Sequence, residues 1–167
     1  MKYGVVHQEA TLVTEADEVW IATAFLHREN PERNDFTVRE IRDRAAREAI
    51  NGRLRIGVYR HAHLHCVANL PPNTGKWRML YATGRLTRRL YREGDPYHPA
   101  REGARSLPDR ENIPGKYHHL LVWYHSDYSQ KHSTPTVQDS ILELCGLGKG
   151  LWKDEDPDSY VRRLREE

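Results

Sequence analysis

Residues 37–49 read TVREIRDRAAREA, and this stretch predicts both the start of a helix and its buried face. Thr37 and Glu40 match the capping box, in which a threonine hydroxyl and a glutamate each satisfy a free backbone donor. Apolar residues then recur at spacings of 3, 4 and 4, which predicts one inward face: Val38, Ile41, Ala45 and Ala49. The arginines between them are expected to point away from the core: Arg39, Arg42, Arg44 and Arg47. Asn51-Gly52 is expected to end this helix.

A second helix is predicted before this one, beginning at Thr14 and running to about His27. Thr14 is a suitable cap, and acids fill the first turn, where the helix dipole favours them. The rest is apolar on most sides, which is typical of a helix at the centre of a small domain. Residues 1–13 carry few signals and are expected to form an arm or a short strand.

After the capped helix, the sequence predicts a third helix and then a hairpin. In residues 54–69 (LRIGVYRHAHLHCVAN), one helical face holds Val58, Ala62, Cys66 and Asn69, and the other holds Arg60, His63, Leu64 and Val67. Residues 77–81 and 85–91 alternate around Thr83-Gly84, which is typical of a β-hairpin.

Residues 93–115 show no regular pattern and are expected to wrap the core. Residues 116–128 predict an amphipathic helix, and a strand over 119–124 is the alternative because LLVWY favours β-structure. Residues 129–134 resemble a linker, and 135–167 form two short amphipathic pieces that suit a partner surface. The expected fold class is mainly α with a small β-hairpin wing (α+β): a winged helix-turn-helix domain over 14–128 with a short helical C-terminal tail.

The charge of the chain is concentrated in residues 36–92. This stretch has 13 Lys or Arg against 3 acids, whereas the whole chain carries only +2. Two basic helices followed by a basic hairpin are the footprint expected on duplex DNA. The alternative is a basic face that is merely solvated.

The predicted DNA contacts follow from position. A helix in the major groove reads base edges, while most other basic residues meet phosphates. The residues expected near bases are Tyr59, Arg60, His61 and His63. Those expected at the backbone are Thr37, Arg39, Arg53, Arg55, Lys76, Arg85, Arg88 and Arg89.

Catalytic and metal chemistry have little support in the sequence. His61, His63, His65 and Cys66 do not give a usual four-ligand zinc set without distant help. No common hydrolase motif occurs, so no catalytic residue and no cofactor are predicted. The two cysteines form no CxxC pair, and no apolar run is long enough to span a membrane, so a cytoplasmic protein without a membrane partner is expected.

The stretch from Phe36 to Tyr128 resembles a family of uncharacterised prokaryotic winged-helix proteins. The likeness lies in His65-Cys66-Val67-Ala68-Asn69, in the basic segment 85–92, in Gly94-Asp95-Pro96-Tyr97-His98-Pro99 and in 113–124. The resemblance implies a DNA-binding fold and a helix over 116–128. It implies no particular operator and no catalytic residues.

The tail is similar to the C-terminal segment of small bacterial antitoxins, which wraps a toxin, often a PIN-domain ribonuclease. The likeness lies in Ile141-Leu142-Glu143-Leu144, Gly146-Leu147-Gly148-Lys149, Leu151-Trp152 and 156–165. It implies that a partner would be held by Leu142, Leu147, Leu151, Trp152, Tyr160 and Leu164. The family's usual N-terminal β-barrel or ribbon is missing from this sequence, so the partner stays open, and a tail packed on its own domain is an alternative.

Together these patterns predict a non-enzymatic, sequence-specific duplex-DNA-binding protein, a transcriptional regulator of antitoxin type that controls its own operon. Alternatives are the DNA-recognition or accessory component of a restriction-type system, a protein- or RNA-interaction module, and a zinc-dependent nucleic-acid enzyme. A homodimer is compatible with the regulator, although no dimer helix is visible in the sequence.

Overall fold

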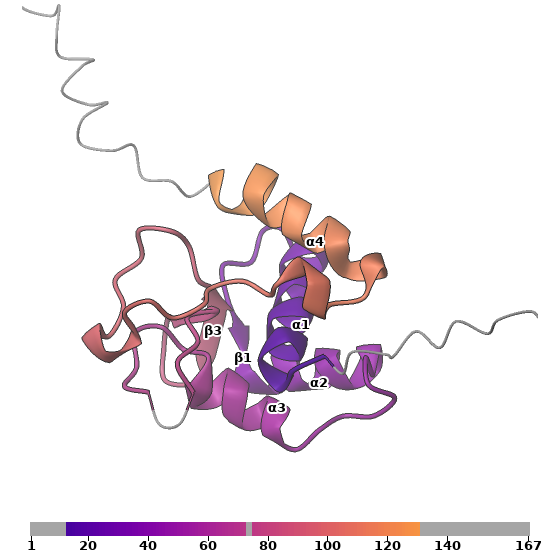
Figure 1. Cartoon of the computed structure of the whole chain (residues 1–167), viewed down its shortest axis with the longest axis horizontal. Helices are drawn as coiled ribbons and strands as arrows, with labels where there is room; N and C mark the ends of the chain where they lie inside the picture. The colour runs from indigo at the N-terminus through magenta and orange to yellow at the C-terminus, as the bar shows by residue number, and fades with distance from the viewer. Residues whose placement is uncertain (1–12, 73–74, 131–167) are drawn as a thin grey trace, which may run out of the picture. The chain divides into compact units, whose positions relative to one another are not determined.

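A computed structural model describes residues 13–72 and 75–130 of the chain (Figure 1). All of them belong to one of two compact units, residues 1–132, and the other unit is residues 133–167. The predicted N-terminal arm, except for Val13, and the predicted tail 135–167 therefore lie outside the described residues. No helix among the described residues has the length and apolar character needed to cross a bilayer.

Helix α1 (Glu15–Glu29) forms the centre of the core, as its apolar sequence predicts. The backbone N–H of Asp17 donates to the Thr14 hydroxyl at 3.2 Å, which confirms Thr14 as the cap. Trp20 and Ile21 are fully buried, and the hydrophobic cluster around them draws on every other helix and strand. The helix ends two residues later than expected.

Strand β1 (Phe36–Thr37) leads directly into helix α2 (Val38–Glu48). The capping box is confirmed, because the N–H of Glu40 donates to the Thr37 hydroxyl at 3.1 Å and the N–H of Thr37 donates to the Glu40 carboxylate at 2.8 Å. The helix stops earlier than the expected Asn51-Gly52, since Ala49 takes a left-handed conformation at φ +46° and caps the end.

The predicted inward face of α2 is confirmed for Val38, Ile41 and Ala45, which are buried. Arg44 corrects the prediction that all four arginines point away from the core. Its side chain is buried against the Phe25 ring, 4.3 Å from the ring centroid, and forms ion pairs with Glu29 and Glu48 at 3.0 and 3.1 Å. Two carboxylates and an aromatic face allow this charge to be buried.

The third helix begins as α3 (Gly57–Arg60) and continues as one π-helical segment (His61–His65). Val58, Ala62 and Cys66 are fully buried, as their shared face predicts. The helix ends at His65 rather than near 69, so the prediction for Val67 is wrong: it leaves the helix, is buried, and forms a bridge to Leu80.

The predicted hairpin is confirmed with shorter strands, β2 (Leu80–Ala82) and β3 (Thr87–Leu90). These strands are antiparallel, with Leu80 opposite Leu90, and β1 adds to the other side of β3, giving the order β1-β3-β2. The sequence did not predict β1, because two residues carry no strand pattern of their own.

The segment between the hairpin and the last helix packs closely on the core with three short 3₁₀ turns: Pro99–Arg101, Arg110–Asn112 and Gly115–Tyr117. Arg101 holds it in place. This side chain is fully buried and donates to the carbonyl oxygens of His65, Leu70 and Trp77 at 2.6–2.8 Å, with a further bond to Leu64.

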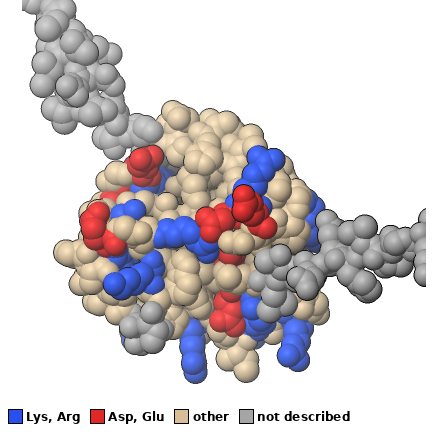
Figure 2. Space-filling model, in the orientation of Figure 1, with Lys and Arg blue, Asp and Glu red and all other residues tan. Residues whose placement is uncertain are grey.

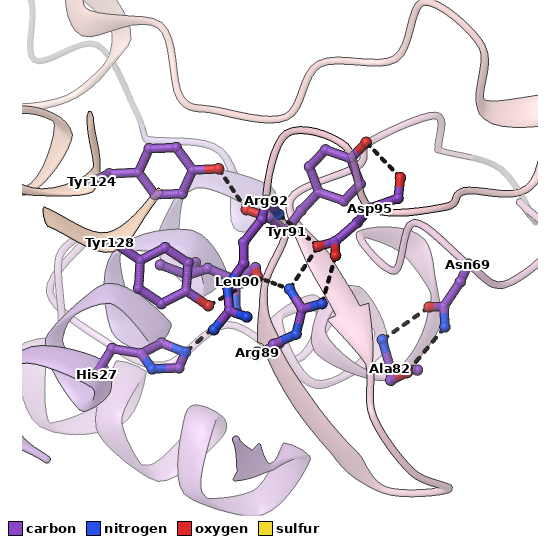
Figure 3. A network of polar contacts seen from close by, with 10 residues as sticks. All are labelled: His27, Asn69, Ala82, Arg89, Leu90, Tyr91, Arg92, Asp95, Tyr124 and Tyr128. Carbon is purple, nitrogen blue, oxygen red and sulfur yellow. Dashed lines mark hydrogen bonds and ion pairs between the residues drawn. The ribbon is translucent and has the colours of Figure 1, made fainter. Parts of the chain in front are cut away.

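Helix α4 (His118–Trp123) continues as a π-helical segment (Tyr124–Tyr128), so the helix expected over 116–128 is confirmed and the strand alternative is wrong. Two tyrosine hydroxyls attach this helix to the end of β3: Tyr124 donates to Tyr91 O at 2.5 Å and Tyr128 to Leu90 O at 3.1 Å (Figure 3). The described fold is therefore mainly helical with a small antiparallel sheet, in agreement with the α+β class.

Candidate nucleic-acid interface

The start of α2, the exposed face of α3 and the turn between β2 and β3 meet at one surface. The N–H of Val38 donates to Leu86 O at 2.9 Å, which joins the turn to the start of α2. The Arg88 guanidinium donates to His63 O, also at 2.9 Å, which joins the turn to the end of the third helix. Two helices and a hairpin turn are thus held together by hydrogen bonds across long sequence separations.

The Arg88 side chain forms one of these hydrogen bonds, and the phosphate contact predicted for it is not supported. Its side chain is only 1% exposed. Besides His63 O, it donates to Gly84 O and Thr87 O at 3.0 and 2.8 Å. Burial lowers the pKa of this guanidinium, and carbonyl oxygens take the place of an acidic partner. Its two terminal nitrogens donate inside the protein and its Nε is buried, so none of its donors is available to DNA.

Arg89 is also committed inside the protein. It forms a bidentate ion pair with Asp95, at 2.6 and 2.7 Å (Figure 3). It also lies over the Tyr81 ring at 4.4 Å from the centroid. Asp95 accepts a further bond from the N–H of Arg92 at 2.8 Å. With 11% of its side chain exposed, Arg89 fixes the loop after β3 and does not offer a phosphate contact.

Arg55 and His61 are likewise turned toward α1 rather than outward. Arg55 forms an ion pair with Glu18 at 3.2 Å and donates to Val13 O. His61 packs on the Trp77 ring, and burial lowers the pKa of its imidazole, so it is neutral at pH 7. The predicted phosphate contact of Arg55 and base contact of His61 are therefore not supported.

The remaining predicted residues stay at or near the surface, and most are exposed. Tyr59 and His63 stack one turn apart on the third helix, with ring centroids 5.9 Å apart and an angle of 18°. Thr37 is half-buried, and its hydroxyl is bonded to Glu40. Four exposed basic residues have no ion-pair partner among the described residues: Arg53, Arg60, Lys76 and Arg85. Arg39 is highly exposed, with Asp43 at 3.9 Å.

Sequence reasoning missed Ile56, which is 87% exposed just before α3. It borders a groove of about 340 Å³ together with Arg42, Leu54, Tyr59 and Arg60. A large apolar side chain so open to water beside arginines is suited to an apolar contact such as a thymine methyl group. In the sequence, the exposure of Ile56 is indicated only by its position, which is not on the buried helical face that contains Val58.

The distribution of charge on the visible face agrees with this geometry. In Figure 2, basic side chains project from the lower edge of the described unit, where Figure 1 places α3. Elsewhere on this face basic and acidic groups are intermixed. Much of the excess charge in residues 36–92 is therefore neutralised inside the fold, and a smaller set of cations remains at the surface.

The histidine-rich segment does not form a metal site among the described residues. No three His, Cys, Asp or Glu side chains in residues 13–72 and 75–130 lie close enough to hold an ion together. Cys66 is fully buried, and burial raises the pKa of its thiol, so it is an inert core residue. The Nδ1 of His61 lies 3.3 Å from its sulfur.

Comparison with protein families, with curated proteins and with solved structures finds no match for this chain. The likeness of residues 36–128 to winged-helix proteins and of the tail to antitoxins therefore remains a prediction. The six residues expected to bind a partner lie outside the described residues: Leu142, Leu147, Leu151, Trp152, Tyr160 and Leu164. The side chains of the surface around α3 are therefore the evidence for what this surface can bind.

Proposed function

We propose that this protein binds duplex DNA as a winged-helix module, with the third helix in the major groove and the β2–β3 turn on the backbone. The order of elements supports this: helix, strand, helix, helix, strand, strand, with the sheet order β1-β3-β2. In helix-turn-helix proteins the second helix of the pair reads bases while the first crosses the backbone. In this proposal α2 crosses the backbone and α3 reads the bases.

The observation that carries the proposal is the bond from Arg88 to His63 O, which fixes the hairpin turn beside the exposed face of the third helix. It brings Arg85, at the turn, onto the same surface as Arg60 and His63. A rigid basic surface with a protruding helix can meet a groove and its flanking phosphates at the same time. A basic cluster that is merely solvated would not need a hydrogen bond that holds the turn beside the helix.

Within this surface, each exposed residue suits a different contact. Arg60 can form a bidentate contact with a guanine edge, and Ile56 can contact a thymine methyl group. Tyr59 and His63, stacked on each other, flank Arg60 and can donate to bases or phosphates. The phosphate contacts fall to Arg39, Arg53, Lys76 and Arg85, with Thr37 at the start of α2.

We further propose a role in transcriptional regulation, with the C-terminal tail engaging a partner protein. The resemblance of the tail to antitoxins supports a toxin as that partner and the protein's own operon as its target. The tail lies outside the described residues, and the surface around α3 is defined by residues 37–88 alone. DNA binding and partner binding can therefore be tested separately.

Binding to a random-sequence duplex and to the corresponding single strand, followed by fluorescence anisotropy, tests the proposal. We expect the duplex to bind more tightly, with an affinity that falls as salt rises because counterions are released. Arg53→Ala and Arg85→Ala should each reduce the slope of log K against log salt by about 0.9, the value for one phosphate contact on B-DNA.

Arg110→Ala is the matched control, because Arg110 is an exposed arginine in the 3₁₀ turn Arg110–Asn112, outside the residues assigned to DNA contacts. It should leave the slope unchanged. Equal binding of duplex and single strand, or equal effects of Arg110→Ala and Arg85→Ala, would remove the winged-helix mode. Selection of a preferred sequence from a random pool, lost in Arg60→Ala, would show that the third helix reads bases.

A further inference from the structure

A pocket of about 150 Å³ lies at the end of the described unit away from α3. Its walls come from the end of α1, the loop that follows it, the residue after β3 and the end of α4. In Figure 1, α4 lies at the upper end and α3 at the lower end. The pocket is therefore separate from the candidate DNA surface, and the proposed function does not use it.

The charge in this pocket is mostly positive. Arg28, Arg33 and Arg92 line it, and Asp127 is the acid among the lining residues. Arg33 is committed to Glu40, at 2.7 and 3.2 Å. Arg28 has no ion-pair partner among the described residues, so its donors are available to a ligand.

Arg92 lines the pocket beside Tyr128. Its guanidinium lies over the Tyr128 ring, 4.9 Å from the centroid, and Figure 3 shows Arg92 beside Tyr128 and His27, whose ring centroids are 4.8 Å apart. The Nε of Arg92 is buried and has no hydrogen-bond acceptor within the described residues.

Aromatic rings form the opposite wall. Trp123 and Tyr128 both line the pocket, and their ring centroids are 5.4 Å apart at an angle of 44°. Trp123 is half-buried, which leaves part of its indole open to a ligand. Guanidinium groups bind phosphate in bidentate fashion, and a half-open indole offers a surface on which a planar base can stack.

We propose that this pocket binds a nucleotide, with its phosphate between Arg28 and Arg92 and its base against Trp123. Asp127 repels the phosphate and so orients the ligand toward the arginines. The same chemistry can come from a free mononucleotide or from the unpaired end of a nucleic-acid strand. At about 150 Å³ the open pocket can enclose only part of one nucleotide, and the rest of the ligand would lie in solvent.

Titration calorimetry of the full-length protein with adenosine 5′-monophosphate, adenosine and inorganic phosphate tests this site. We expect the monophosphate to bind at least tenfold more tightly than either part alone, because both walls must be occupied. Arg28→Glu should weaken its binding at least tenfold, and Trp123→Leu should remove the advantage over inorganic phosphate. Arg53→Glu, an equal charge reversal beside α3, should have no effect.

Binding of adenosine that equals that of the monophosphate would overturn the proposal, as would equal losses in Arg28→Glu and Arg53→Glu. An unchanged thermal midpoint in Arg28→Glu shows that the variant is folded. A 5′-phosphorylated single-stranded oligonucleotide distinguishes the two sources: if it depends on Arg28 and binds more tightly than the monophosphate, the source is a strand end. Duplex binding by Arg28→Glu reports on the proposed DNA surface independently.

Discussion

At the scale of single residues, the arginines of this chain divide into two kinds that look alike in the sequence. Arg88 and Arg101 are buried and donate to backbone carbonyls, whereas Arg53, Arg60 and Arg85 are exposed. A buried guanidinium is tolerated only where many acceptors surround it. The first kind therefore stabilises the fold, and the second remains available for the proposed DNA contacts.

Replacing Arg88 should demonstrate this difference. Arg88→Met keeps much of the apolar stem but removes the Arg88 hydrogen bonds to the carbonyls of His63 and Gly84, and leaves Thr87 O with only the Thr83 N–H as its donor. We expect a loss of about 2–4 kcal/mol in the free energy of unfolding, measured with urea at pH 7.

Arg85→Met is the control, three residues away and exposed, and it should change stability by no more than about 0.5 kcal/mol. A result in which both variants unfold at the same urea concentration would contradict the structural role of Arg88.

The sequence alone does not distinguish the buried arginines from the exposed ones, because their partners are distant in the chain. The acceptors of Arg88 and Arg101 are main-chain oxygens of His63 and His65, 25 and 36 positions away, and any residue type can supply them. The burial of Arg44 could not be predicted either, because Glu29, one of the two acids that pair with it, lies 15 residues earlier on α1. Helical periodicity reports which residues share a face, but it does not report which charged residue finds partners when that face is packed.

At the scale of elements, the start of α2 was fully readable because its signals are local. Thr37 and Glu40 satisfy each other's backbone donors three residues apart. The end of the third helix and the existence of β1 were not readable, because both depend on β2 and β3. Phe36 becomes a strand residue only by pairing with Arg88, and Asn69 leaves the helical pattern to bond both backbone groups of Ala82.

The cap of α2 should make stability depend on pH. Hydrogen bonds from Arg33, with those from Thr37, lower the pKa of Glu40 from 4.5 to about 2. Because the folded pKa is the lower one, the ionised carboxylate stabilises the fold above pH 4.5. That contribution is lost as pH falls toward about 2.

We therefore expect Glu40→Gln to be less stable than the wild type by about 1 kcal/mol at pH 7, mostly through the cap, since the Arg33 pair is largely exposed. The difference should shrink steadily between pH 4.5 and 2 in urea denaturation experiments. Glu111→Gln, at an exposed position, should follow the wild type throughout. A pH-independent difference would assign the effect to packing instead of charge.

At the scale of the whole molecule, the candidate DNA contacts all fall between Thr37 and Arg85, inside the unit of residues 1–132. The hydrophobic cluster of that unit runs from Val13 to Tyr128. All described members of the core and of the proposed reading surface thus lie before residue 131. The compact core and the α+β class were predictable, because hydrophobic periodicity is spread along the whole segment.

A version of the protein that ends at Gln130 should therefore fold and bind the same duplex as the full chain. We expect equal affinity and an equal salt slope in anisotropy measurements, because no predicted phosphate contact is removed. A loss of more than about threefold, or about 0.7 kcal/mol, would assign a DNA contact to residues 131–167. Equal binding would support a partner protein as the role of the tail.

Arg101 donates to five main-chain carbonyl oxygens, and this arrangement determines which substitutions the region can accept. Its partners are the main-chain oxygens of Leu64, His65, Leu70, Pro71 and Trp77. Side chains at those positions can be exchanged without touching a single one of these bonds, provided that the backbone keeps its path. Position 101 has no such freedom, since lysine offers a single ammonium group in place of a planar fork of five donors. We therefore expect selection on this region to act mainly on position 101.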